Sequence, residues 1–183
     1  MTDTKQRIAS DLERSFASLG FADQGVESLR AQADVSIRTL YRHFPSREAM
    51  IVGALEHRDA SYFEWLDGGP QTGAAHVLHP LVRLGDWLHQ VANTGCLFLN
   101  AWAEYPDSDA IAAIVKDHKA RLADEFRQRL NRVATAQDTT HLAETLFLLH
   151  EGMTQAARLQ GRERATEAAM RAARAALAAE GID

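Results

Sequence analysis

The stretch from Val35 to Glu48 constrains the fold of this chain more than any other part of the sequence. It has the pattern of a short helix, a corner and the start of a second helix. Ser36 is a suitable N-cap, and the valine before it can pack on Leu40 as a hydrophobic staple. Leu40 and Phe44 are four residues apart and give the short helix one buried stripe. Pro45 ends this helix, and the serine after it can cap the next one.

The outward side of the short helix carries cations and hydrogen-bond donors but no carboxylate. Its side chains are those of Ile37, Arg38, Thr39, Tyr41, Arg42 and His43. Such a surface suits a polyanion, and Arg47 follows in the first turn of the next helix, where backbone N–H groups also attract phosphate. A charge cluster by itself is more often a solvated helix face. The interpretation therefore depends on the segments around it.

The preceding segment supplies two helices that match this interpretation. Residues 4–19 have apolar side chains at helical spacing and end at Gly20, and residues 24–33 form a second helix. A short turn at 34–37 then leads into the helix at 36–44. This order of helices is that of a helix-turn-helix, in which the last helix enters the major groove of DNA.

The rest of the sequence also predicts helices, and no strand pattern competes with them. The nine expected helices lie at about 4–19, 24–33, 36–44, 46–66, 74–94, 97–105, 108–133, 139–160 and 163–180. The helix at 46–66 spans roughly 30 Å, which is long enough to connect a small N-terminal unit to the remainder of the chain. Residues 67–73 form the clearest linker.

Composition places limits on the class of protein. The chain has 183 residues and a net charge of -5, so any binding of nucleic acid has to come from a local basic surface. A single cysteine excludes an internal disulfide and suits a reducing compartment. No apolar run is long enough to span a bilayer, and the polar N-terminus is not a signal peptide. We expect a cytoplasmic protein without membrane contact.

The sequence also resembles the DNA-binding domain of the tetracycline-repressor (TetR) family of bacterial regulators, over about residues 5–66. The residues that carry the resemblance are Phe16, Gly20, Phe21, Val26, Leu29, Ala33, Val35, Ser36 and, above all, the run Thr39–Glu48. The chain departs from the family pattern at Arg30, where a small residue is usual, and at Asp34, where glycine is usual. A basic or glycine pair is usual where Ile37 and Arg38 stand, so the base preference need not match that of a relative.

The resemblance implies an all-α protein of about nine helices. A three-helix helix-turn-helix DNA-binding domain would occupy residues 1–47, and a helical effector-binding and dimerisation domain would occupy 48–183, with the helix 46–66 connecting them. The implied function is that of a transcriptional regulator, with repression as the family default. It would bind a palindromic operator on double-stranded DNA as a homodimer and respond to a small-molecule effector.

Two other classes of function remain as alternatives. One is a helical interaction module whose basic helix binds a partner other than DNA; the other is an enzyme that uses a C-terminal cavity. No nucleophile–base spacing, phosphate loop or metal motif supports an enzyme, and we expect no cofactor. Steep salt dependence would separate DNA binding from the interaction module.

The DNA-binding residues are predicted from the helix-turn-helix. Arg38, Thr39 and Arg42 are the candidates for base edges, because arginine suits bidentate contact with guanine. The candidates for phosphate contacts, which fix register, are Ser36, Tyr41, His43 and Arg47, with a further backbone contact from Gln24. Ile37 completes the predicted set.

A small-molecule site is predicted in the middle of the chain, which has more aromatic and polar side chains than a plain core needs. Its candidate residues are Trp87, Cys96, Phe98, Asn100, Trp102, Tyr105, His118, Phe147 and His150. Asn100 would orient the ligand if it faces inward. Cys96 could act as a redox or electrophile sensor, but without a second cysteine an inert buried thiol is the simpler interpretation. His76 and His79 lack the further ligands of a metal site, so none is expected.

Self-association is predicted in the last two helices, where small residues allow close helix approach. The candidate interface residues are Leu149, Gly152, Met153, Ala156, Leu159, Ala169, Ala172, Ala173 and Ala176. The alternative is that the same residues pack within one subunit. TetR-family proteins dimerise through their last two helices, and the resemblance implies the same arrangement here.

Overall fold

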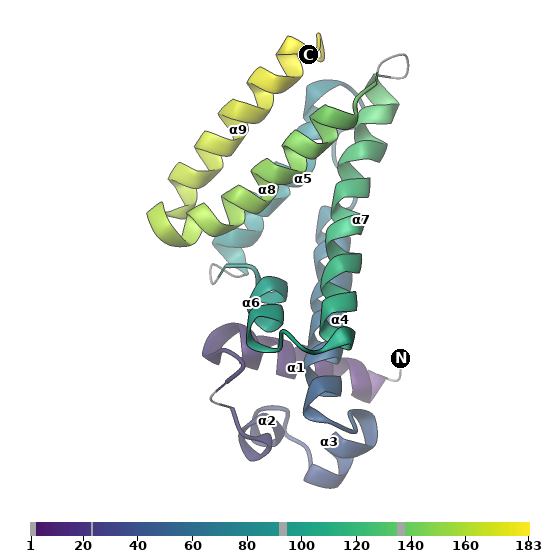
Figure 1. Ribbon diagram of the computed structural model, residues 1–183, viewed down its shortest axis with the longest axis vertical. Helices are drawn as coiled ribbons and strands as arrows, with labels where there is room; N and C mark the ends of the chain where they lie inside the picture. Colours follow the sequence, from purple (N-terminus) through teal and green to yellow (C-terminus); the bar gives the residue numbers. More distant parts are fainter. Residues whose placement is uncertain (1–2, 23, 92–94, 135–137) are drawn as a thin grey trace. The chain divides into compact units, whose positions relative to one another are not determined.

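The computed structural model describes residues 3–22, 24–91, 95–134 and 138–183, and all regular structure in these ranges is helical. Its helices (Figure 1) are α1 Asp3–Leu19, α2 Val26–Gln32, α3 Ile37–His43, α4 Arg47–Leu66, α5 Gly73–Gln90, α6 Leu97–Glu104, α7 Asp109–Val133, α8 Thr140–Gln160 and α9 Arg162–Ala179. The all-helical prediction is confirmed. Only α5 ends clearly earlier than predicted, and the last predicted residues, 92–94, lie outside the described ranges.

The chain divides into two compact units. The first contains residues 1–64 and 96–118, and the second contains 65–95 and 119–183. Both α4 and α7 therefore contribute to both units. This division differs from the predicted boundary after residue 47, because most of α4, all of α6 and the start of α7 pack with the helix-turn-helix. The predicted division of functions between 1–47 and 48–183 stays a prediction.

The core of the first unit holds α3 by its inner stripe. Leu40 is fully buried and Phe44 is 2% exposed, as predicted. Phe16 and Phe21 stack with ring centroids 4.8 Å apart, and Gly20 between them takes a left-handed φ of 77° that closes α1. Gly53 on α4 lies directly under the Phe44 ring, where a Cβ atom would collide with it. The absence of a side chain at this position lets α4 approach the end of α3.

Polar pairs join the helices inside the first unit. Buried Arg58 on α4 forms an ion pair with Glu13 on α1. His118 on α7 contacts Asp59 on α4 at 2.8 Å, and Phe98 on α6 stacks on the His118 ring at 3.8 Å. Each pair has little exposed surface, so loss of one partner would leave a buried charge or polar group without compensation.

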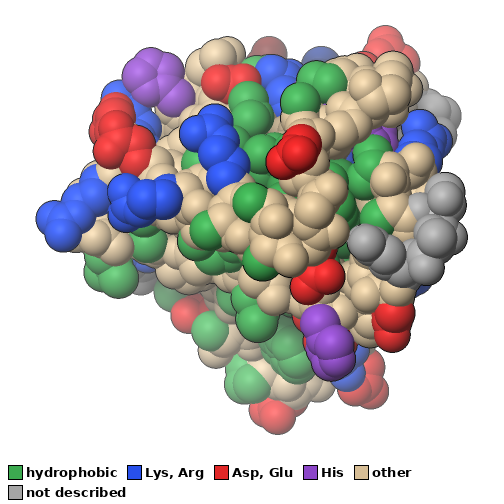
Figure 2. Space-filling model, turned by 90° about the horizontal axis from the view of Figure 1, so that it is seen from above, with side chains coloured by type: hydrophobic (Ala, Val, Ile, Leu, Met, Phe, Trp, Pro, Cys, Tyr) green, Lys and Arg blue, Asp and Glu red, His purple; other side chains and the backbone are tan. Residues whose placement is uncertain are grey.

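The second unit is built from α5, α8 and α9, together with the end of α7. α9 packs on both α8 and α5, and Gly161, with φ of 90°, forms the sharp turn between α8 and α9. Figure 2 looks onto the end of this unit that carries the C terminus. On that face, Lys and Arg side chains gather toward the side on which α9 lies in Figure 1, with hydrophobic side chains exposed between them.

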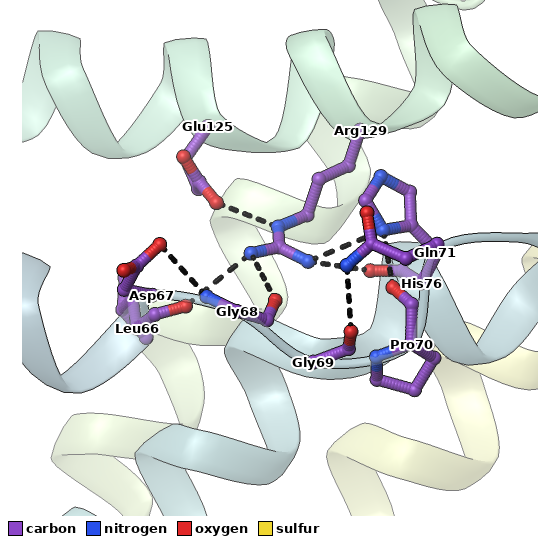
Figure 3. Close-up of polar contacts among 9 residues, drawn as sticks. All are labelled: Leu66, Asp67, Gly68, Gly69, Pro70, Gln71, His76, Glu125 and Arg129. Carbon is purple, nitrogen blue, oxygen red and sulfur yellow. Dashed lines mark hydrogen bonds and ion pairs between the residues drawn. The ribbon is translucent and has the colours of Figure 1, made fainter.

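The predicted linker at 67–73 is held by one buried arginine of α7 (Figure 3). Arg129 donates through Nε to Glu125 at 2.6 Å and through its terminal nitrogens to the carbonyls of Leu66 at 3.3 Å, Gly68 at 3.4 Å and His76 at 3.1 Å. The segment between α4 and α5 is therefore a fixed turn of the second unit. Within the described ranges, no helix combines the length and the hydrophobicity that a bilayer crossing requires.

Candidate nucleic-acid interface

Ser36 starts α3 as predicted. Its backbone is extended, with φ of −71° and ψ of 153°, and its hydroxyl accepts a hydrogen bond from the Thr39 amide at 3.1 Å. The Ser36 and Thr39 hydroxyls also lie 2.9 Å apart, within hydrogen-bond distance. At the other end, the Phe44 amide donates to the Leu40 carbonyl at 2.9 Å. These local bonds and the burial of Leu40 fix which side of α3 faces outward.

The turn before α3 tolerates the two departures from the family pattern. Asp34 takes a left-handed φ of 46°, the conformation that glycine or aspartate can supply in such a turn. The Val35 amide closes the turn onto the Arg30 carbonyl at 3.3 Å. The Arg30 side chain is half-buried, and its Nε reaches Glu27 at 2.8 Å at the edge of the packing. Both residues are therefore accommodated without loss of the turn.

The outward face of α3 keeps the composition that the sequence predicted. Arg38 and Arg42 are exposed and lie one helical turn apart, so they form a cationic stripe. Ile37 and Tyr41, which are 40% and 42% exposed, form a second stripe beside it. Thr39 and His43 are half-buried, and the exposed Ser36 is at the edge of this face. No carboxylate lies on this helix.

Gln24 does not lie where a DNA contact requires it. Its side chain is 3% exposed, and its amide donates to the backbone carbonyls of Ser15 at 3.1 Å and Gly20 at 2.6 Å. Its Oε1 accepts from the Ser15 hydroxyl. The structure therefore gives Gln24 an internal role, joining α1 to the segment before α2, in place of the predicted backbone contact with DNA.

Arg47 is half-buried and also makes internal contacts, and its predicted phosphate contact stays a prediction. Its Nε donates to the Tyr105 hydroxyl at 2.9 Å, and its two terminal nitrogens donate to the carbonyls of Phe21 and Gln24. The guanidinium thus joins the α1–α2 segment to the residue that follows α6. No sequence signal marks this contact, because Tyr105 lies 58 positions away.

A second bridge lies beside the first. Ser46 caps α4 by accepting from the Ala49 amide at 3.0 Å, as predicted. In the first turn of α4, Glu48 accepts from the Ser108 hydroxyl at 2.5 Å, and that hydroxyl accepts in turn from the Ile111 amide at 3.1 Å. The first turn of α4 is therefore bound twice to the segment between α6 and α7.

The predicted effector residues are divided between the two units. The first unit contains Cys96, Phe98, Asn100, Trp102, Tyr105 and His118, and the second contains Trp87, Phe147 and His150. Asn100 is exposed, so the condition that it faces inward is not met, and it is not the orienting residue we expected. Cys96 is buried, which agrees with an inert thiol. Phe98 and His118 stack on each other in the core of their unit.

In the second unit, Trp87 and His150 also serve as packing residues. Trp87 makes an edge-to-face contact with Trp65 at 5.6 Å, and His150 makes one with Phe126 at 6.2 Å. Burial alone would raise the pKa of Glu151, but its contacts with His150 and Lys119 outweigh burial and lower that pKa to about 2. Glu151 therefore stays ionised beside His150 at neutral pH.

The predicted dimer residues fall into two groups. Met153, Ala169 and Ala173 are buried among the helices of their own subunit, which is the alternative that the sequence left open. The remainder are half-buried or exposed: Leu149, Gly152, Ala156, Leu159, Ala172 and Ala176. Leu148 is 67% exposed and Leu159 is 84% exposed, and Leu148 was not among the residues predicted from the sequence.

The fold and the face of α3 together define a helix-turn-helix DNA-binding protein. A sequence model described as "Bacterial regulatory proteins, tetR family" matches residues 11–54, and one described as "Tetracyclin repressor-like, C-terminal domain" matches residues 80–173, just over half of the chain. The chain therefore belongs to the TetR family, and it is a DNA-binding transcriptional regulator.

Individual relatives agree with this assignment. The chain is 25% identical to the HTH-type transcriptional regulator YjdC of Escherichia coli over 138 residues, which cover 73% of this chain and 72% of YjdC. Its structure is similar to a TetR-family transcriptional regulator from Streptomyces coelicolor, with a TM-score of 0.86, 25% identity and coverage of 97% and 95% of the two chains. A putative TetR regulator from Streptomyces avermitilis shares the fold at a TM-score of 0.81 and 23% identity, with both chains fully covered.

Arg38 and Arg47 give a first prediction, because one is exposed and the other is bound internally. We expect Arg38→Ala to relax preference at one base pair, with a loss of about 1–3 kcal/mol of discrimination. We expect Arg47→Ala to lower the free energy of unfolding by about 2 kcal/mol or more, since two backbone carbonyls lose their donor. Urea unfolding and binding to randomised duplexes measure the two effects. If Arg47→Ala is as stable as wild type and its DNA binding depends less steeply on salt, Arg47 contacts phosphate instead.

Ile37 gives a second prediction. An exposed isoleucine at the start of a recognition helix is suited to contact the C5-methyl group of thymine. Replacing the contacted thymine with deoxyuracil removes that methyl group and should weaken binding of the wild-type protein about fourfold. The same replacement should have little effect on Ile37→Ala, and Val82→Ala, at an exposed apolar position outside α3, serves as the control variant. If every thymine of the half-site can be replaced without loss, Ile37 reads no methyl group.

Proposed function

We propose that this regulator binds a palindromic operator as a homodimer, reads each half-site with the outward face of α3, and is controlled by a small-molecule effector. The carboxylate-free face of α3 carries the proposal. The chain has a net charge of -5, so its affinity for DNA has to come from this local surface. Repression by occupancy of the operator is the proposed mode of action.

The roles of the α3 residues follow from their exposure. Arg38 and Arg42 lie on one exposed stripe and are proposed to reach base edges, together with Thr39. Ser36, Tyr41 and His43 lie around that stripe and are proposed to contact phosphate. The Thr39 hydroxyl lies 2.9 Å from that of Ser36, and this contact favours one rotamer of Thr39 in the groove.

A homodimer is proposed because one short helix reads only a few base pairs. The exposed side of α8 supports it. Leu148, Gly152, Gln155 and Leu159 are all exposed and follow helical spacing, so they form one stripe. Leu148 and Leu159, at 67% and 84% exposure, supply the apolar area of this stripe. Gly152 in the middle of the stripe would let a second copy of the helix approach closely.

Control by an effector is proposed to act through the two bridges at the start of α4. The Arg47–Tyr105 and Glu48–Ser108 contacts join the segment after α6 to the helix-turn-helix. An effector that displaces α6 would shift Tyr105 and Ser108, and through their contacts with Arg47 and Glu48 it would change the position of α3. Such a ligand controls binding only if it favours one arrangement of the protein over the other.

The dimer proposal predicts the effect of charge on the α8 stripe. A Leu148→Glu/Leu159→Glu double variant should sediment as a monomer, because burying four carboxylates in a two-fold interface is unfavourable. Affinity for a full palindrome should fall to that for a single half-site. Val91→Glu, at another exposed apolar position of the same unit, is the matched control. A double variant that remains dimeric would place the interface elsewhere.

The Arg47–Tyr105 contact gives a further prediction, because its loss should affect control by an effector more than it affects binding to the operator. Tyr105→Phe removes the hydroxyl that accepts from Arg47 and leaves α3 unchanged. Its affinity for the operator should stay within about fivefold of wild type, since one partly exposed hydrogen bond contributes about 1 kcal/mol or less. A compound selected from a library for releasing wild-type protein from labelled operator should release this variant less completely. Full release of the variant would remove the Arg47–Tyr105 contact from the proposed mechanism.

A further inference from the structure

A polar cavity of about 230 Å³ lies within the second unit, between the 67–71 turn, the start of α5 and the end of α7. Of the residues that the structure describes, only polar side chains line it, and they include those of Asp67, Gln71, His76, Glu125, Arg129 and Arg132. It contains none of the nine effector residues that the sequence predicted. Pockets for drug-sized molecules measure roughly 300–1,000 Å³ and are mostly apolar, so this cavity suits a smaller and more polar occupant.

His76 leaves one buried nitrogen of this cavity without a partner. The residue is 2% exposed, and its Nδ1 donates to the Pro70 carbonyl at 2.7 Å. Because Nδ1 carries the proton, Nε2 is an acceptor, and it has no hydrogen-bond partner among the described residues. In Figure 3 the His76 ring lies between α5 and α7, the helix that carries Glu125 and Arg129. A buried acceptor without a donor costs about 1–3 kcal/mol, which a bound donor would recover.

The charged side chains around the cavity differ in their exposure to solvent. Arg129 is 7% exposed, and all three of its nitrogens already donate, to Glu125 and to backbone carbonyls. Glu125 uses Oε1 for that contact, which leaves its second oxygen as an acceptor. Arg132 is exposed at the rim, where its guanidinium can donate to an occupant of the cavity. The less exposed side of the cavity therefore offers acceptors, His76 Nε2 and Glu125, and the exposed side offers the Arg132 guanidinium together with the Asp67 carboxylate.

We propose that this cavity binds a small zwitterion of amino-acid size. Its ammonium group would lie at the inner wall and donate to His76 Nε2 and to Glu125. Its carboxylate would lie at the rim and accept from Arg132, with Gln71 beside it. The two arginines and two carboxylates of the lining balance in charge, which disfavours a simple anion or a simple cation. Among the described residues no group of three or more His, Cys, Asp or Glu side chains could hold a metal ion.

The test is calorimetric titration of the full-length protein, without DNA, against the common L-amino acids. At least one should bind. For that amino acid, the matched amine without a carboxylate and the matched acid without an ammonium group should each bind at least about tenfold more weakly, because each loses one charged hydrogen-bond partner. The inference is overturned if no amino acid binds, as a cavity filled only by water would behave. It is also overturned if a single-charge analogue binds as tightly.

Two variants locate the binding site. His76→Asn keeps a donor at the position of Nδ1 for the Pro70 carbonyl and removes Nε2, so the thermal midpoint of the ligand-free protein should change little while affinity falls about tenfold. Arg132→Gln should weaken binding by a similar factor. Arg127→Gln, an exposed arginine of α7 outside the cavity, is the matched control. Unchanged affinity in both cavity variants would overturn the assignment.

The same titration separates this inference from the proposed regulation. The proposed site does not depend on effector control. A bound amino acid that leaves operator affinity unchanged supports the site and removes that amino acid as the effector. A bound amino acid that changes operator affinity, with the change lost in His76→Asn, supports both.

Discussion

A helix of seven residues does not hold its shape alone in water, because the cost of starting a helix is recovered only over several turns. α3 therefore depends on the burial of Leu40 and Phe44, which the rest of the first unit supplies. Burial of these two side chains decides which residues face outward. The cationic and apolar stripes of α3 are a consequence of that packing, and the identity of the chain as a DNA-binding regulator follows from them.

Local signals made most of the fold predictable. Helical spacing, the Ser36 cap, the left-handed Gly20 and the tolerance of Asp34 for the same conformation all act within a few residues of one another, and the structure contains each of them. The internal contacts of Gln24 and Arg47 were not predictable, and the reason is different. Gln24 and Arg47 look available to DNA when only their neighbours in sequence are considered. Their actual partners are backbone carbonyls and side chains from other elements, and such contacts leave no periodic pattern.

The same limit applies to the second unit. The sequence could identify small residues on α8 and α9, but it could not say which of them face α5 and which face solvent. Met153 and Ala173 face inward, whereas Leu148 faces outward. The cavity beside His76 and Arg129 was missed for a similar reason. Its walls come from the turn before α5, the start of α5 and the distant α7, and it has no aromatic cluster that would mark it as a ligand site.

Gly53 has a consequence for how this regulator can evolve. Any side chain at that position would press on the Phe44 ring, so the ring or the end of α3 that carries it has to shift. Where such a shift moves α3, a substitution at Gly53 would change DNA binding although the residues on the outward face of α3 stay the same. Comparing DNA-facing residues alone would then misjudge how far two such regulators have diverged.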